Sequence, residues 1–127
     1  MIKKFLDLGM QPLANKYLLK SDLIKKKRED FYHLEIGYDT KNKLVSILNT
    51  ISSKKMFDNK YPYRASMSKT MLTSFKVLST KIKKEFKPKF LIEIGSNDGS
   101  FIKNFDKKKV FGIEPCSNVA KITKKMG

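Results

Sequence analysis

The apolar pattern of the second half of the chain predicts a strand–turn–helix–strand unit. Lys89 to Gly95 carries the apolar and β-branched run of a strand that is buried on both faces. Gly95 to Gly99 is a turn of small and short polar residues, and a helix can begin within Ser100 to Phe105. Val110 to Ile113 then forms a second strand. This order is half of a nucleotide-binding unit.

The longest helical pattern runs from Ser66 to Phe86. Its apolar residues recur at steps of three and four, so they form one stripe. The stripe consists of Met67, Met71, Phe75, Leu78 and Ile82. Ser66 or Ser68 can cap the start of the helix, and Pro88 ends it. We interpret the stripe as core rather than as part of a cofactor pocket.

The first half of the chain predicts a β-hairpin that follows irregular segments. Phe31 to Tyr38 and Leu44 to Asn49 are the strands, and Asp39 to Lys43 is the turn, since Asp and Asn tolerate turn geometry. Before them, Leu6 to Leu19 holds a short apolar turn, and the polar run Lys20 to Asp30 bridges to the hairpin.

The basic composition does not indicate a specific nucleic-acid partner. The formal net charge is +16, but only Arg28 and Arg64 among the 28 basic residues are arginine. Arginine supplies the bidentate contacts that nucleic-acid recognition favours. A lysine excess with abundant Ile, Asn and Phe is typical of an AT-rich genome. We therefore expect general attraction to polyanions at low salt and no specific nucleic-acid binding.

The chain shows no targeting or membrane segment in its sequence, so we expect a cytoplasmic protein without a membrane partner. Cys116 is the only cysteine, which excludes an internal disulfide. We interpret it as filling the start of a helix rather than as a nucleophile. His33, the only histidine, lies on a predicted strand. We interpret it as a packed or edge side chain rather than as a ligand or base.

The turn at Gly95 favours a nucleoside ligand without a pyrophosphate. Glu114 stands 19 residues after Gly95, near the place where parallel sheets put the carboxylate that binds a ribose diol. A dinucleotide fingerprint has three glycines at G-x-G-x-x-G, whereas Asn97 and Ser100 occupy the second and third positions here. Asn97 tolerates positive φ. The alternative is a structural glycine turn in another kind of α/β protein.

Four segments, in order and at the approximate spacing, resemble the sugar C-methyltransferase family. They are LDLGMQPLAN at Leu6 to Asn15, MFDNKYPYRASMSKTM at Met56 to Met71, EIGSNDGSF at Glu93 to Phe101, and GIEPCSNVAKI at Gly112 to Ile122. The family combines an N-terminal zinc-binding segment, a central Rossmann-like domain that binds S-adenosylmethionine (SAM), and a C-terminal domain. Its members methylate carbon on nucleotide-linked keto-deoxysugars. The resemblance covers nearly all of this chain and about the first third of the family's length.

The resemblance implies an α/β fold in two parts. Residues 1–60 would be a small β-hairpin subdomain, a degenerate zinc-binding segment, and residues 61–127 the start of the Rossmann-like SAM-dependent methyltransferase domain. The implied SAM-binding residues are Glu93, Gly95, Ser96, Asn97, Asp98, Gly99, Glu114 and Pro115. Tyr63 would contribute a hydroxyl to the active site or, alternatively, be a buried aromatic that anchors the helix start. The substrate of a complete homologue would be a nucleotide-linked sugar.

The resemblance also implies a zinc site in the hairpin, for which the ligands are missing. Asp39 and Asn42 occupy the approximate positions of the second cysteine pair, and the first pair would lie before Met1. A structural zinc site needs four ligands, usually cysteine or histidine. We therefore expect that zinc is lost and that the chain binds no stoichiometric zinc.

Two functions stay open at this point. The first is a SAM-dependent C-methyltransferase, with this chain as an N-terminal piece that is inactive alone, because the family's general base lies beyond the matched region. The second is a non-catalytic remnant, or a module that binds a nucleotide or an anion. The sequence specifies neither the sugar, nor the carbon that is methylated, nor the oligomeric state.

Overall fold

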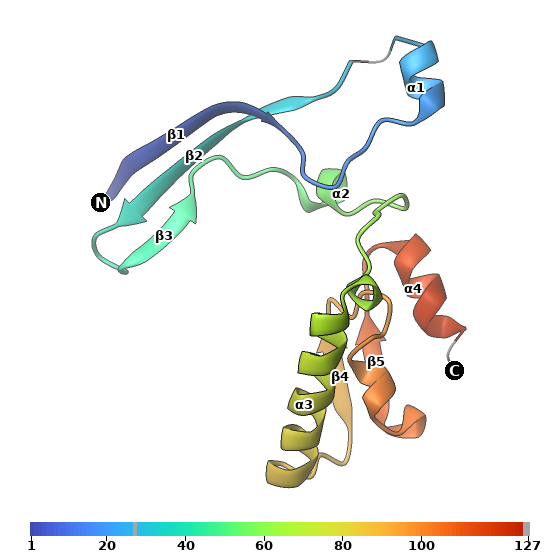
Figure 1. Cartoon of the computed structure of the whole chain (residues 1–127). Helices are drawn as coiled ribbons and strands as arrows, with labels where there is room; N and C mark the ends of the chain where they lie inside the picture. Colours follow the sequence, from blue (N-terminus) through green and yellow to red (C-terminus); the bar gives the residue numbers. More distant parts are fainter. Residues whose placement is uncertain (27, 126–127) are drawn as a thin grey trace. The chain divides into compact units, whose positions relative to one another are not determined.

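The computed structural model describes residues 1–26 and 28–125, which form two compact units joined between Met56 and Phe57 (Figure 1). The sequence placed this boundary after residue 60. Unit 1 (Met1–Met56) contains a three-stranded antiparallel sheet, and unit 2 (from Phe57) contains a two-stranded parallel sheet with helices. The chain therefore has a mixed α/β fold.

Unit 1 is built on strands β1 (Ile2–Pro12), β2 (Phe31–Asp39) and β3 (Leu44–Ile47), in the order β1-β2-β3. The predicted hairpin is confirmed as β2 and β3. Strand β1 was not predicted, because Gly9 and Pro12 indicated an irregular segment. The structure accommodates both: Gly9 has φ of +67° within a register shift, and Pro12 ends an edge strand.

Two short helices of unit 1 also lay outside the sequence prediction. Helix α1 (Lys20–Ile24) begins the run that we expected to be a polar bridge, and α2 (Ser53–Met56) follows the sheet. The Asp22 carboxylate accepts a hydrogen bond from the backbone nitrogen of Leu19 at 3.0 Å, which closes the first turn of α1. Helices of four or five residues carry no apolar periodicity that a sequence pattern could reveal.

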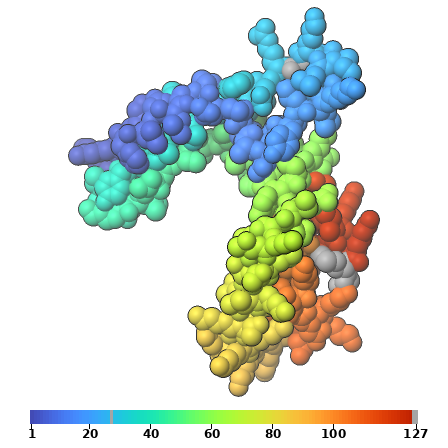
Figure 2. Space-filling model, in the orientation of Figure 1, coloured from blue at the N-terminus to red at the C-terminus, as the bar shows by residue number. Residues whose placement is uncertain are grey.

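Unit 1 lacks a hydrophobic core within the described residues, where Gly37 alone is buried. Its β1 is exposed along nearly all of its length, and its atoms form part of the surface drawn in Figure 2. The buried apolar residues all belong to unit 2 and are Ala65, Phe101, Ile102, Cys116 and Val119. Unit 1 therefore depends on strand pairing and polar contacts more than on apolar burial.

Helix α3 (Lys69–Glu85) of unit 2 confirms the longest predicted helix, with a later start. Ser68 caps it by accepting a hydrogen bond from the Met71 nitrogen at 3.2 Å. The apolar stripe is only partly core: Phe75 packs edge-on against Phe101, but Met67 precedes α3 in the 3₁₀ turn η1 (Ala65–Met67) and is 81% exposed.

Strands β4 (Leu91–Ile94) and β5 (Val110–Ile113) pair in parallel, with Leu91 opposite Val110. The prediction that the first of them is buried on both faces is wrong. Burial alternates along each strand, and Ile94 is 83% exposed. The other exposed apolar residues of this face are Ile92, Phe111 and Ile113. Within the described chain, packing covers one face of the sheet.

The connection between β4 and β5 contains 3₁₀ turns, η2 (Ile102–Asn104) and η3 (Lys107–Lys109), in place of the expected α-helix. The Asn104 amide donates to the carbonyl oxygens of Ser100 (3.2 Å) and Phe101 (2.8 Å), which ends the turn before an α-helix forms. Helix α4 (Ser117–Lys124) follows β5. A ligand site at an α-helix N-terminus after β4 is therefore absent from the described fold.

Candidate functional site

The turn after β4 is held against the end of β5 by backbone hydrogen bonds. The nitrogens of Gly95 and Ser96 both donate to the carbonyl oxygen of Ile113, at 2.8 and 3.1 Å. Gly95 and Gly99 have φ of +76° and +74°, and Asn97 has φ of +49°. The positive φ at Asn97 confirms the sequence prediction and explains why a residue other than glycine is tolerated there.

Asn97 connects this turn to three other segments of unit 2. Its side-chain oxygen accepts from the Ala65 nitrogen at 2.8 Å, and its side-chain amide donates to the Tyr63 carbonyl oxygen at 3.2 Å. Its backbone nitrogen donates to Glu114 Oε2 at 2.8 Å, and its carbonyl oxygen accepts from Thr123 Oγ1 at 3.1 Å. The Asn97 side chain therefore acts within the protein, where it fixes the segment before α3.

Asp98 is 2% exposed, and both of its carboxylate oxygens are hydrogen-bonded. One accepts from the Ser66 nitrogen at 3.0 Å, and the other from Ser100 Oγ at 2.5 Å and from the Ser100 nitrogen at 3.3 Å. Burial raises the pKa of Asp98, but these hydrogen bonds outweigh burial and hold the pKa below its ordinary value. Asp98 is thus a buried anion that ties the turn to the segment before α3.

Glu114 follows β5 and lines a cavity of about 370 Å³. Its two carboxylate oxygens accept hydrogen bonds from the backbone nitrogens of Asn97 and Cys116, each at 2.8 Å. Since each carboxylate oxygen has two lone pairs, acceptor capacity remains for a ligand hydroxyl. The cavity is lined by Ser96, Gly112, Glu114, Pro115, Ser117, Ala120, Lys121, Thr123 and Lys124.

Glu93 is a second unusual carboxyl group near this turn. Burial is the largest cause that raises its pKa, a hydrogen bond from the Ile102 backbone opposes it, and the negative charges of Asp98 and Glu114 add to it, so that the pKa is about 7. Its Oε2 atom is buried without a hydrogen-bond partner among the described residues. The charges of Asp98 and Glu114 therefore act on Glu93 near the carboxyl ends of the two parallel strands.

The structure brings together some of the expected cofactor residues and separates others. Ser96, Glu114 and Pro115 line the same cavity. The residues Glu93, Gly95, Asn97, Asp98 and Gly99 do not line it. Gly95, Asn97, Asp98 and Gly99 belong to the turn beside it, and Glu93 lies on β4 just before that turn. Tyr63 is 45% exposed, so its interpretation as a buried aromatic is wrong, and its carbonyl oxygen is what contacts the turn.

Sequence reasoning missed the wall of the cavity that α4 supplies. Ser117, Lys121 and Lys124 are spaced by four and three residues, so they share one face of the helix. The helix expected to start at Cys116 was the signal for this wall, because a helix that directly follows Glu114 and Pro115 starts beside the carboxyl end of the strand.

Cys116 is fully buried at the position before α4. Burial, followed by the effect of Glu114, raises the pKa of its thiol to about 11. The thiol is therefore protonated at neutral pH, which supports its interpretation as packing rather than as a nucleophile. At the hairpin turn, Asn42 donates its side-chain amide to Asp39 Oδ2 at 2.7 Å, so these two residues stabilise the turn where the resemblance implies cysteines.

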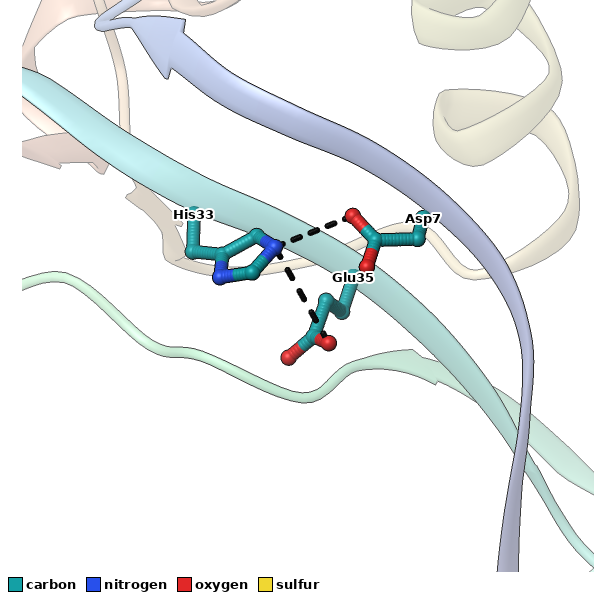
Figure 3. A group of neighbouring side chains, drawn as sticks. All are labelled: Asp7, His33 and Glu35. Carbon is teal, nitrogen blue, oxygen red and sulfur yellow. Dashed lines mark hydrogen bonds and ion pairs between the residues drawn. The ribbon is translucent and has the colours of Figure 1, made fainter.

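A second group of chemically active side chains lies on unit 1 and consists of Asp7, His33 and Glu35 (Figure 3). His33 Nε2 is 3.0 Å from Asp7 Oδ1 and 4.0 Å from Glu35 Oε1. His33 lies on the central strand β2 with a half-exposed side chain, so it is neither an edge nor a fully packed residue. Sequence reasoning missed the group because it did not predict β1, the strand that carries Asp7.

The described helices are all too short or too polar to cross a lipid bilayer. Comparison of the chain with protein-family models and with curated proteins found no match.

Proposed function

We propose that unit 2 binds SAM and is part of a Rossmann-like, SAM-dependent methyltransferase. The reaction that we propose is the one that the resemblance implies, methylation of carbon on a nucleotide-linked keto-deoxysugar. The observation that carries the proposal is the position of Glu114, whose carboxylate lines a cavity of about 370 Å³ directly beside the turn after β4. That volume lies within the range of small-ligand sites.

The carboxylate of Glu114 is suited to bind a ribose diol. It stands at the carboxyl end of a parallel strand, where open α/β sheets bind nucleosides, and it retains lone pairs after its two backbone contacts. Ser96 and Gly112 line the same cavity, and a Cβ atom on Gly112 would lie only 2.7 Å from Ser96 Oγ. This close packing brings the turn next to the strand end.

The charge near the turn favours a cationic ligand over a pyrophosphate. The negative charges of Asp98 and Glu114 add to burial in raising the pKa of Glu93, so negative charge is concentrated near the turn. SAM carries a sulfonium and an ammonium group, which such carboxylates attract, whereas they repel phosphates. The turn also lacks the second glycine that lets a backbone approach a pyrophosphate.

One observation favours the alternative of a module that binds an anionic nucleotide. Lys121 and Lys124 line the same cavity as Glu114, on the α4 side. Two lysines beside a ribose-binding carboxylate would attract phosphate groups. The two functions therefore differ in which ligand charge the cavity prefers.

Calorimetric titration of the full chain with SAM, S-adenosylhomocysteine and ATP distinguishes the methyltransferase from the module that binds an anionic nucleotide. We expect SAM to bind at one site and more tightly than S-adenosylhomocysteine, which lacks the sulfonium charge. Glu114→Gln should weaken SAM binding about 10- to 100-fold, the scale of a hydrogen bond to a charged group. The matched control is Glu85→Gln at the exposed end of α3, which should change nothing.

Two outcomes would contradict the proposal. If ATP binds more tightly than SAM and Lys121→Gln removes that binding, the alternative holds. If none of the three ligands binds, neither function is supported. The chain alone is expected to transfer no methyl group, so the catalytic half is tested with labelled SAM and keto-sugar nucleotides on a version lengthened by the family's C-terminal part.

A further inference from the structure

The antiparallel pairing of β1 and β2 brings Asp7, His33 and Glu35 to one place on unit 1. Asp7 lies directly opposite Glu35 in the register of the two strands. His33 stands two residues before Glu35, and alternate residues of a strand point to the same face. Figure 3 shows the three side chains directed toward one another. The fold therefore assembles one imidazole and two carboxylates on adjacent strands.

One distance within this group matches a metal coordination shell, and the others are somewhat longer. Ligand atoms at about 2.0–2.2 Å from a common ion lie roughly 3.0–3.6 Å from one another. His33 Nε2 and Asp7 Oδ1 are 3.0 Å apart, and His33 Nε2 and Glu35 Oε1 are 4.0 Å apart. All three ligand atoms lie within 4.8 Å of one another. Small side-chain rotations would complete the shell.

The group already attracts a cation. The Lys4 ammonium lies 2.6 Å from Glu35 Oε1 and 3.2 Å from Asp7 Oδ2, so it bridges the two carboxylates. Both carboxylates therefore face one cation at this place.

The residues around Asp7, His33 and Glu35 resemble the surroundings of a metal site. The Asn49 amide donates to Glu35 Oε2 at 2.6 Å, an outer contact of the kind that orients metal ligands. Asn49 and His33 also line a cavity of about 350 Å³ in unit 1. In addition, the described residues of unit 1 bury no apolar side chain. Small units of this kind gain stability from a bound ion.

We propose that Asp7, His33 and Glu35 bind one divalent transition-metal ion of the zinc type, which takes the place of the Lys4 ammonium. The imidazole selects such an ion over Mg²⁺ or Ca²⁺, and three protein ligands leave a position for water or for a ligand. This site has nitrogen and oxygen donors, unlike the cysteine site that the resemblance implies. Zinc bound here would contradict the expectation that the chain binds no stoichiometric zinc.

The test is a Zn²⁺ titration of the metal-free full chain, followed by nuclear magnetic resonance of the imidazole. Because His33 is the only histidine, the protein has a single imidazole signal set. We expect saturation at one ion per chain, with a shift of the His33 nitrogens. Asp7→Asn and His33→Gln should each weaken Zn²⁺ binding at least tenfold. Lys4→Met should strengthen it, because the competing ammonium is removed.

Two controls separate this site from general metal binding. Glu29→Gln removes one carboxylate elsewhere on unit 1, and Cys116→Ser removes the only thiol. Both should bind Zn²⁺ like the parent protein. The proposal is overturned if the His33 signals do not move, if binding does not saturate, if His33→Gln binds unchanged, or if Cys116→Ser abolishes binding. The variants in unit 1 change exposed or half-exposed side chains, so they should still fold. Cys116→Ser changes a buried side chain of unit 2, and the His33 signal then shows whether unit 1 is still folded.

Discussion

Asn97 donates its backbone N–H to the carboxylate of Glu114 across 2.8 Å, so the turn after β4 and the end of β5 fix each other. The same Asn97 side chain binds the segment before α3 through Ala65 and Tyr63. One residue thus aligns the carboxylate that lines the cavity with the turn that borders it. The geometry of the proposed SAM site depends on this contact.

Replacement of Asn97 should test its structural role. Asn97→Ala removes the acceptor of the Ala65 N–H, which is buried, and places an alanine at φ of +49°. The lost hydrogen bond and the backbone strain together should lower the free energy of unfolding by about 2–4 kcal/mol. Asn97→Gly keeps the favourable φ and should lose less. Urea unfolding of both variants measures the difference, and equal losses would show that backbone strain contributes nothing.

Glu93 should make stability depend on pH. Its pKa is about 7 in the folded protein and near 4.5 when unfolded, so the folded state binds more protons between these values. Stability should therefore fall as pH rises from about 4.5 to 7 and stay low above. Glu93→Gln should raise the melting temperature at pH 8 and change it little at pH 4.5. A variant that unfolds with the same pH dependence as the parent would refute this role.

Gly95 provides a test of whether SAM approaches the turn after β4. It has φ of +76°, and an added Cβ atom would meet no atom within 4 Å. Gly95→Ala should therefore cost about 1–2 kcal/mol of stability through backbone strain alone. If SAM approaches this open space, Gly95→Val should abolish SAM binding while circular dichroism still reports a folded protein. Unchanged SAM affinity in a folded Gly95→Val protein would argue against that approach.

The start of α3 allows a matched comparison of two serines. Ser68 accepts a hydrogen bond from the Met71 nitrogen, whereas Ser66 contacts the Asp98 carboxylate with its backbone nitrogen and its side chain. Ser68→Ala should lower the free energy of unfolding by about 1 kcal/mol, the usual contribution of a helix cap. Ser66→Ala should lower it less, because Asp98 keeps its hydrogen bonds from the Ser66 backbone nitrogen and from Ser100. Thermal unfolding measures both losses. A larger loss for Ser66→Ala than for Ser68→Ala would contradict the assignment of Ser68 as the cap of α3.

Much of the local structure could be predicted because its causes are local. Helix α3 follows from apolar spacing and a serine cap, and β2, β3, β4 and β5 follow from short apolar runs bounded by turn residues. The positive φ of Asn97 follows from its side-chain chemistry. Glu114 could be placed beside the turn because parallel strands end at the same edge of a sheet.

The remaining features depend on partners that are distant in the sequence. Strand β1 contains Gly9 and Pro12 and becomes a strand because β2 pairs with it, which brings Asp7 opposite Glu35. The apolar runs of β4 and β5 indicated burial on two faces, whereas the described packing covers only one.

The sequence by itself determined the order of β2, β3, α3, β4 and β5 and the place of Glu114 beside the turn, because propensity, capping and turn chemistry act over a few positions. Only the tertiary structure decided that Lys121 and Lys124 line the same cavity as Glu114, and that Asp7 meets His33. Those contacts arise from helix placement and strand register, which the free energy of the whole unit selects and no short segment encodes.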